Sequence, residues 1–241
     1  MTPLMTVAPH PSPVDVASGL PRPLGLSPDP FGDRMGTRPL AGRLKRATDL
    51  AICLGVLLPA SFVVAAAAFL LLCIDRHNPF FADPRVGRSG AMFRCWKLRT
   101  MKGSGEVFAQ YLEDNPEEAE RYRRSRKVSR DPRTTPLGSF LRKASIDEIP
   151  QVLNVLKGEM SIVGPRPLAP DEFSHRGPYR AALISVRPGI TGLWQVRGRS
   201  DLSYRRRLVL DGFYVSRWDF ALDFWILAAT PAALLARKGA R

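Results

Sequence analysis

The sequence predicts an α+β fold: a helix-rich domain with one small β-hairpin, preceded by a helix that inserts into a membrane. Three observations predict it. Every residue from Leu50 to Ile74 is uncharged. Two apolar stretches then flank a turn-rich segment at residues 82–90, as in a hairpin. Apolar residues at helical spacing follow further along the chain, for example from Ile149 to Leu156.

Composition limits the class of protein. The chain of 241 residues is 45% hydrophobic, which supports one domain of ordinary size with residues left for a tail or a membrane segment. Its formal net charge of +14 favours an anionic partner: nucleic acid, anionic lipid or a phosphorylated substrate. The three cysteines suggest no disulfide framework, because two of them lie in the apolar run, and this favours a reducing compartment.

The first segment, residues 1–42, is predicted to be a disordered tail. Nine of the 22 prolines lie in its first 40 residues, which have no apolar periodicity and no signal-peptide core. No internal repeat is found at solenoid or propeller spacing.

The second segment, residues 43–75, is predicted to be a membrane-inserted helix. Its uncharged part would be roughly 37 Å long as a straight helix, against a hydrocarbon core of roughly 30 Å. Arginine or lysine residues lie on both sides of it, so the positive-inside rule draws both ends to the cytoplasm. A helix that enters and returns satisfies this, with Pro59 as the break. A tilted spanning helix with a tolerated kink is the alternative.

After the helix, the stretches NPFF and AMFRCWKLRTM are predicted to form the hairpin. Period-two alternation places Phe93, Cys95, Lys97 and Arg99 on one face, where two cations could bind phosphate or simply be solvated. The charged segment at residues 106–127 is predicted to be a single surface helix whose acidic-then-basic order follows the helix dipole.

The stretch SIDEIP, Ser145 to Pro150, puts two adjacent carboxylates before an apolar helical pattern that stops at Gly158. One interpretation is a capping box formed by Ser145 and Glu148. Pro150 argues for a start nearer Asp147, with both carboxylates at the positive end of the helix dipole.

The remaining motifs are consistent with a phosphate site but are not specific. Arg166 lies between two prolines, which limit the orientations of its guanidinium. RPGITGLWQVRGRSD, Arg187 to Asp201, has three glycines at which backbone can approach a ligand. ALDFWILAATPAALLA, Ala221 to Ala236, is too short and interrupted to span a membrane easily, and we predict an interfacial or docking helix.

Four ordered blocks together carry a resemblance. These are KRATD, FRCWKLRTM, DPRTTPLGSFLRKASIDEIPQVLNVLKGEMSIVGPRPL and RPGITGLWQVRGRSD. From about Arg43 to Arg237 the chain resembles the bacterial sugar transferase family. Its members are monotopic polyprenol-phosphate phosphoglycosyl transferases that start exopolysaccharide and other surface-glycan assembly. The resemblance is to the short form, so residues 76–241 would be the catalytic domain. The membrane helix departs from the family pattern at one point. The family's Ser-Pro break aligns with Ser61 and Phe62, whereas the proline of this chain is Pro59, about one turn earlier.

The resemblance implies a reaction and a set of site residues. Asp147 would be the nucleophile and Glu148 would help to hold Mg²⁺. The diphosphate would be bound by the basic residues Lys97, Arg99, Arg142 and Arg166, and Gln195 and Arg199 would belong to a substrate loop. A phosphosugar would pass from a UDP-sugar to polyprenol (undecaprenyl) phosphate with release of UMP, through an aspartyl phosphosugar intermediate.

The resemblance also implies partners and a location. The enzyme would lie in the bacterial inner membrane with its catalytic domain on the cytoplasmic face, in contact with membrane lipid and with homo-oligomerisation as an option. Two alternatives stay open: a glycosyltransferase that moves the sugar alone, and a non-catalytic basic membrane adaptor. No motif of a nucleic-acid-binding fold is present, so nucleic acid is not an expected partner.

Overall fold

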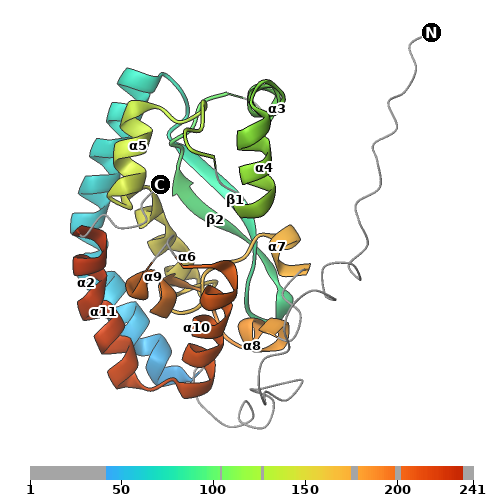
Figure 1. Cartoon of the computed structure of the whole chain (residues 1–241). Helices are drawn as coiled ribbons and strands as arrows, with labels where there is room; N and C mark the ends of the chain where they lie inside the picture. Colours follow the sequence, from blue (N-terminus) through green and yellow to red (C-terminus); the bar gives the residue numbers. More distant parts are fainter. Residues whose placement is uncertain (1–41, 104, 126–127, 175–178, 199–201, 236–241) are drawn as a thin grey trace, which may run out of the picture. The chain divides into compact units, whose positions relative to one another are not determined.

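The longest element is helix α2, Arg43–Leu70, which continues as the π-helix η2, Leu71–Asp75 (Figure 1). The computed structural model describes residues 42–103, 105–125, 128–174, 179–198 and 202–235, all within one unit that spans Phe31–Arg241. The predicted tail, residues 1–42, therefore lies outside the described residues except for Gly42, which precedes α2 in an extended conformation.

The remaining described elements follow in chain order. They are β1 (Phe80–Val86), η3 (Arg88–Gly90), β2 (Met92–Leu98), α3 (Gly105–Asp114), α4 (Pro116–Ser125), α5 (Pro136–Lys143), η4 (Ile146–Gln151), α6 (Val152–Lys157), β3 (Ser161–Val163), α7 (Pro170–Ser174), α8 (Arg180–Ile184), β4 (Gly189–Thr191), α9 (Leu193–Arg197), α10 (Tyr204–Arg217) and α11 (Phe220–Leu235). The described chain is helix-rich with a small antiparallel hairpin, which confirms the predicted α+β class.

The predicted hairpin is formed by β1 and β2, which pair antiparallel with Phe80 opposite Leu98 and Val86 opposite Met92. Phe93 and Cys95 are buried on the side predicted from the alternation. A second small sheet was not predicted: β3 and β4 pair in parallel, with Ser161 opposite Gly189. Each of these strands has only three residues, too few for a recognisable alternation.

The charged segment at residues 106–127 was predicted as one helix, and this was wrong. It forms two helices, α3 and α4, with Asn115 between them. Pro116 has no backbone N–H to continue the first helix, yet its fixed φ suits the first position of a new one. The Asn115 carbonyl then accepts the hydrogen bond from the Ala119 N–H that opens α4. Residues 126–127 lie outside the described chain.

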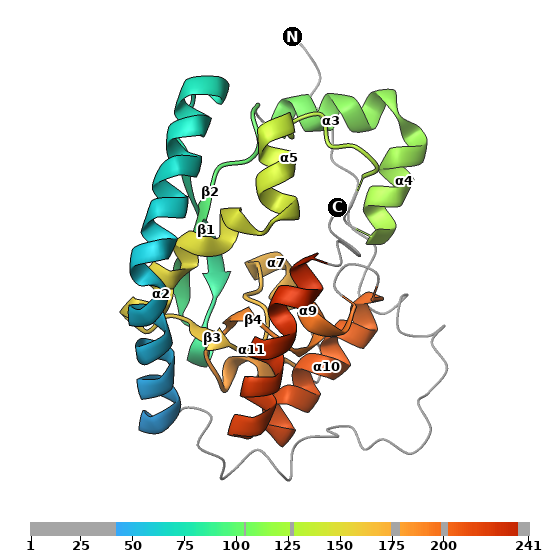
Figure 2. The same cartoon turned by 90° about the vertical axis from the view of Figure 1, so that its left-hand side faces the viewer.

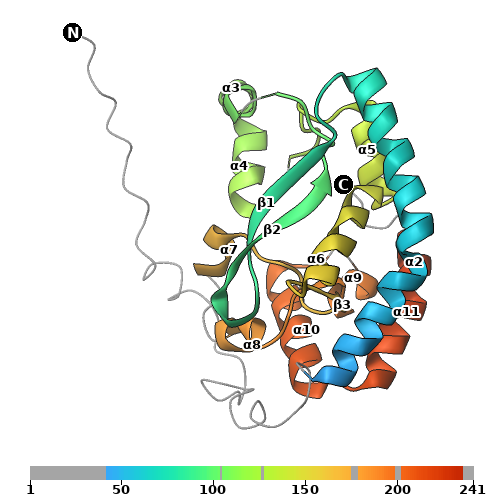
Figure 3. The same ribbon diagram turned by 180° about the vertical axis from the view of Figure 1, so that it is seen from behind.

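The continuous helix formed by α2 and η2 is bonded near both of its ends to other elements of this unit. Near its start, Arg46 donates to the carbonyls of Val155 and Leu156, at 2.5 and 3.0 Å. Near its end, Asp75 accepts a hydrogen bond from Thr135 Oγ1 at 2.8 Å and lies 3.2 Å from Lys102 Nζ. Figures 2 and 3 show α2 along one side of this unit, next to α6, β2 and α5.

Between these attachments α2 presents an apolar surface. Its large exposed side chains here include Leu54, Leu58, Phe62 and Phe69, each with more than 60% of its area exposed. Among the described residues, Arg43–Asp75 is the one helix long and apolar enough to cross a membrane. The helix runs through Pro59 without ending, so the predicted break is not seen there. One proline removes a single ladder hydrogen bond, and a helix of this length tolerates that loss. Re-entry into the membrane stays a prediction.

The core lies between α2 and the elements packed on it. The largest buried cluster joins Cys53 of α2 to the hairpin through Phe93 and Cys95, and to α10 and α11 through Tyr214 and Ile226. A second cluster packs Ala67, Ala68 and Leu71 of α2 against Leu98 and Leu141. These contacts hold the hairpin, α5 and η4 in place beside the helix.

Candidate active site

The carboxylate pair lies in the first turn of η4, directly after a sharp change of chain direction. Thr135 caps the start of helix α5, since its Oγ1 accepts from the Gly138 N–H at 2.8 Å, and the helix runs from Pro136 to Lys143. Ser145 then adopts the left-handed region, with φ of 55°, which few non-glycine residues do. This turn leads the chain from α5 into η4, so that Asp147 and Glu148 follow at once.

The capping-box interpretation does not match this geometry. The Ser145 side chain makes no capping hydrogen bond, and η4 is a 3₁₀ helix that begins at Ile146. The start itself is the one that a cap at Ser145 would give: Ser145 is the residue before η4 and Pro150 is the fifth residue of η4, so the alternative start nearer Asp147 is not observed. The stop at Gly158 is confirmed: this residue ends α6 with φ of 86°, a conformation that favours glycine.

Strand β2 brings a cation to the pair. Lys97 Nζ lies 3.0 Å from Glu148 Oε1, and both side chains keep partial contact with solvent. This places Lys97 toward η4, on the same strand face as the buried Phe93 and Cys95.

The pKa of Asp147 is raised from 3.8 to about 6, chiefly because its carboxyl is buried and secondly because Glu148 is adjacent. The positive charges of Lys97 and Arg142 oppose this rise without cancelling it. We predicted that the helix N-terminus would favour the ionised form of Asp147, but burial has the larger effect and raises the pKa. At pH 7, about one unit above this pKa, roughly nine tenths of the carboxyl is ionised, as a poorly solvated anion.

A pocket opens beside Glu148 where β1, β2, η4, the segment after β3, β4 and α9 meet. Two predicted site residues in addition to Lys97 and Glu148 line it, namely Arg166 and Gln195. The full set of lining residues is Arg85, Lys97, Glu148, Gln151, Arg166, Pro167, Gly189, Ile190 and Gln195. Residues up to 110 positions apart in the sequence thus meet in one pocket.

Among the lining residues with charged or polar side chains, Arg85 and Gln151 were missed by the sequence analysis. Arg85 pairs with Asp83 and donates to the Pro167 carbonyl at 3.4 Å, next to Arg166. Directly opposite residues of an antiparallel pair point to the same face, and Arg85 is opposite Phe93. The register of the hairpin would have placed Arg85 on the face of Lys97. Gln151 is 2% exposed and follows the carboxylates on η4, where no sequence signal distinguishes it.

The other predicted residues are placed as follows. The Arg166 guanidinium lies 6.0 Å from the centre of the Trp194 ring. Gln195 Nε2 donates to the Ile190 carbonyl at 3.0 Å. Arg142 lies in the last turn of α5, exposed, with its charge acting on Asp147. Arg99 is not among the pocket residues: it contacts the Phe80 carbonyl and the Phe81 ring. Arg199 lies outside the described residues.

The arrangement suits a substrate with several phosphate oxygens. Three cations and the Glu148 carboxylate line the pocket, and Asp147, which is not itself a lining residue, precedes Glu148 in the chain. Charge-assisted hydrogen bonds from arginine and lysine are the usual way in which proteins hold phosphate. Across the described part of the chain no group of three or more histidine, cysteine or acidic side chains could enclose a metal ion. Mg²⁺, however, is typically held by one or two carboxylates together with substrate phosphates, and Glu148 beside Asp147 fits that pattern.

Comparison with known proteins gives a consistent picture. The family model described as bacterial sugar transferase matches residues 40–237. The exopolysaccharide production protein ExoY of Sinorhizobium fredii is 41% identical over 202 residues, covering 83% of this chain and 89% of the relative. The undecaprenyl-phosphate galactose phosphotransferase of Salmonella typhimurium is 38% identical over 200 residues, covering 82% and 41%. The UDP-glucose:undecaprenyl-phosphate glucose-1-phosphate transferase of Caulobacter vibrioides is 38% identical over 206 residues, covering 81% and 71%.

Proposed function

This chain belongs to the bacterial sugar transferase family, and we propose that it transfers a phosphosugar from a UDP-sugar to polyprenol phosphate as a first step of exopolysaccharide assembly. Relatives named for transfer of galactose phosphate and glucose 1-phosphate to undecaprenyl phosphate support this reaction class. The observation that carries the proposal is the adjacent pair Asp147 and Glu148 beside a pocket lined by Arg85, Lys97 and Arg166.

In the first step, a carboxylate oxygen of Asp147 attacks the β-phosphorus of the UDP-sugar. A phosphorus–oxygen bond forms to Asp147, and the bond from that phosphorus to the bridging oxygen breaks, so that UMP leaves. The buried carboxylate is poorly solvated, which suits it to act as a nucleophile when it is ionised. Arg166 and Lys97 hold the phosphate oxygens. The prolines on each side of Arg166 restrict its backbone, so Arg166 loses less conformational freedom when it binds phosphate.

In the second step, an oxygen of polyprenol phosphate attacks the same phosphorus. The new phosphorus–oxygen bond forms as the bond to Asp147 breaks, which releases polyprenyl diphosphosugar and restores the carboxylate. A two-step path suits this site, because a soluble donor and a lipid acceptor need not be bound together. Mg²⁺, held in part by Glu148, would offset negative charge on the diphosphate and on the leaving UMP.

The attachment of α2 at both ends supports a location on one side of the membrane. Arg46 and Asp75, near opposite ends of this helix, are bonded to the same unit. A helix that crossed the bilayer would separate these two attachments by the full membrane thickness. We therefore favour both ends on the cytoplasmic side, with the exposed apolar face of α2 in the lipid.

The test is to mix purified protein with a UDP-sugar and Mg²⁺ before any lipid acceptor is added. We expect UMP release limited to a single turnover and a phosphosugar adduct on the intact protein by mass spectrometry. Asp147→Asn should give neither product, since an amide keeps the shape but is a far weaker nucleophile. Release of UDP would instead identify a glycosyltransferase that moves the sugar alone, and the absence of any nucleotide release would favour the membrane adaptor.

A further inference from the structure

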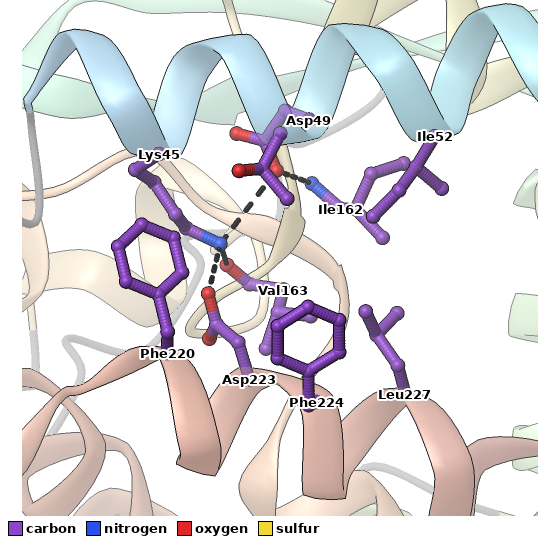
Figure 4. Close-up of a pocket in the computed structure, with 10 residues that line it drawn as sticks. Lys45, Asp49, Ile52, Ile162, Val163, Phe220, Asp223, Phe224 and Leu227 are labelled. Carbon is purple, nitrogen blue, oxygen red and sulfur yellow. Dashed lines mark hydrogen bonds and ion pairs between the residues drawn. The ribbon is translucent and has the colours of Figure 1, made fainter.

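A buried polar cluster outside the proposed active site joins α2, α10, α11 and β3. Figure 4 shows its residues Lys45, Asp49 and Asp223. The Lys45 cluster, as we name it, consists of Lys45, Asp49, Ser161, Tyr214 and Asp223. Each of these residues is at most 6% exposed. Charged side chains are rarely buried to this degree unless they are paired and hydrogen-bonded, so the contacts within the cluster must compensate for lost hydration.

Lys45 is the central residue of the cluster. Its Nζ lies 2.7 Å from Asp223 Oδ2 on α11 and 3.6 Å from Asp49 Oδ1, one turn away on α2. It also donates a hydrogen bond to the Val163 carbonyl at 3.2 Å. Figure 4 shows the ammonium group between the two carboxylates and this carbonyl.

Strand β3 is held by further contacts of the same cluster. Asp49 accepts hydrogen bonds from Ser161 Oγ at 2.8 and 2.9 Å and from the Ile162 N–H at 3.1 Å. The Tyr214 hydroxyl lies 2.8 Å from Asp223 Oδ1 and 3.0 Å from the Val163 carbonyl. The Val163 carbonyl therefore lies within hydrogen-bond distance of Lys45 Nζ, Ser161 Oγ and the Tyr214 hydroxyl.

This carbonyl immediately precedes the segment that carries Arg166. The chain continues from Val163 through Gly164 and Pro165 to Arg166. The Gly164 N–H donates to the Thr191 carbonyl at 2.9 Å, and the Pro165 carbonyl accepts from the Gly189 N–H at 2.8 Å. Because prolines fix φ on both sides of Arg166, a displacement at Val163 is passed to the arginine with little absorption by the backbone.

We propose that Lys45 is a positioning residue: through the Val163 carbonyl it sets the position of the Arg166 guanidinium in the pocket. Because Lys45 belongs to α2, this contact couples the packing of the membrane helix against β3 to the formation of the phosphate site. The effect on the reaction rests on the proposed function, in which Arg166 holds substrate phosphate. The effect on the backbone does not, and it can be measured separately.

The test measures amide hydrogen exchange of the full-length protein in lipid nanodiscs, without substrate. We expect Lys45→Met to accelerate exchange in the peptide that contains residues 161–168 by roughly tenfold, as expected for the loss of a charge-assisted hydrogen bond. The hairpin peptide, residues 80–98, should keep its rate. Arg43→Met is the matched control, because it removes an exposed cation from the same turn of α2.

A second variant covers the case in which Lys45→Met, which leaves two buried carboxylates without their cation, does not fold. Tyr214→Phe removes one hydroxyl that reaches the same carbonyl, and it should accelerate exchange in the same peptide. Unchanged exchange there, or an equal acceleration in the hairpin, overturns the positioning role, since a merely structural residue would loosen the unit as a whole.

Kinetics then separates this proposal from the proposed function. Lys45→Met should raise the donor KM, and its effect should be less than additive with that of Arg166→Lys, because both act on one contact. Additive effects on the donor KM would overturn the positioning role. If exchange at residues 161–168 accelerates but Arg166→Lys itself leaves the donor KM unchanged, the positioning role stands and the assignment of Arg166 to phosphate fails.

Discussion

Replacing Asp147 with asparagine should abolish turnover while making the protein more stable. Burial, with the adjacent Glu148, raises the pKa of this carboxyl from 3.8 to about 6. The folded protein thus binds a proton at Asp147 more tightly than the unfolded chain does, and it loses stability as the pH rises from about 4 to about 6. The amide has no charge to desolvate, so Asp147→Asn avoids this loss.

The shift sets the size of the effect. A change of about two pKa units corresponds to about 3 kcal/mol if the carboxyl has no solvent contact. The carboxyl is largely buried, but the Asp147 residue as a whole keeps some solvent exposure, so we expect about 1 to 2 kcal/mol at pH 8, or a rise in melting temperature of about 4 °C for a unit of this size. The gain should shrink toward pH 4, where both states are protonated.

Thermal melts in detergent with EDTA, at pH 4.5 and pH 8, measure this gain without interference from metal or donor. Glu113→Gln is the matched control, because it neutralises an exposed carboxylate on α3. The reasoning is refuted if Asp147→Asn melts below the wild type at pH 8. In a purely structural role as a helix cap, Asp147→Ala would lose roughly 1 kcal/mol and the asparagine variant little.

Three further outcomes are expected. Arg166→Lys should raise the donor KM about tenfold, because an ammonium cannot reproduce the bidentate guanidinium fork; a KM near the wild-type value would mean that Arg166 is a solvated turn residue. Glu148→Gln should increase the Mg²⁺ concentration needed for half-maximal UMP release, and an unaltered requirement would remove Glu148 from the metal site. Cysteines placed near Arg43 and near Arg88, in a background without the native cysteines, should react only with a cytoplasmic reagent. Periplasmic labelling near Arg43 would establish a spanning helix.

Much of the fold could be predicted from short-range patterns. The apolar helix, the hairpin and the stop at Gly158 each depend on residues within one segment, where hydrophobic period and glycine conformation are sufficient evidence. The break between α3 and α4 at Pro116 was also present in the sequence. It was missed because the acidic-then-basic charge order suggested one continuous helix.

The candidate site was only partly accessible to the same reasoning. Lys97, Glu148, Arg166 and Gln195 were named from their motifs, and the fold brings them to one pocket. Arg85 joins them because the hairpin register turns it to the face of Lys97, and this register is a property of two strands rather than one.

Two properties of the molecule arose only in the tertiary structure. The raised pKa of Asp147 depends on how deeply neighbouring elements bury its carboxyl, which overrides the local helix dipole that the sequence suggested. The contacts of Lys45 with Val163 and Asp223 join positions more than 100 residues apart. By itself the sequence determined the long apolar helix, the hairpin and the stop at Gly158, because those preferences are local. Which charges meet, and how far water is excluded from them, was decided by packing between distant segments.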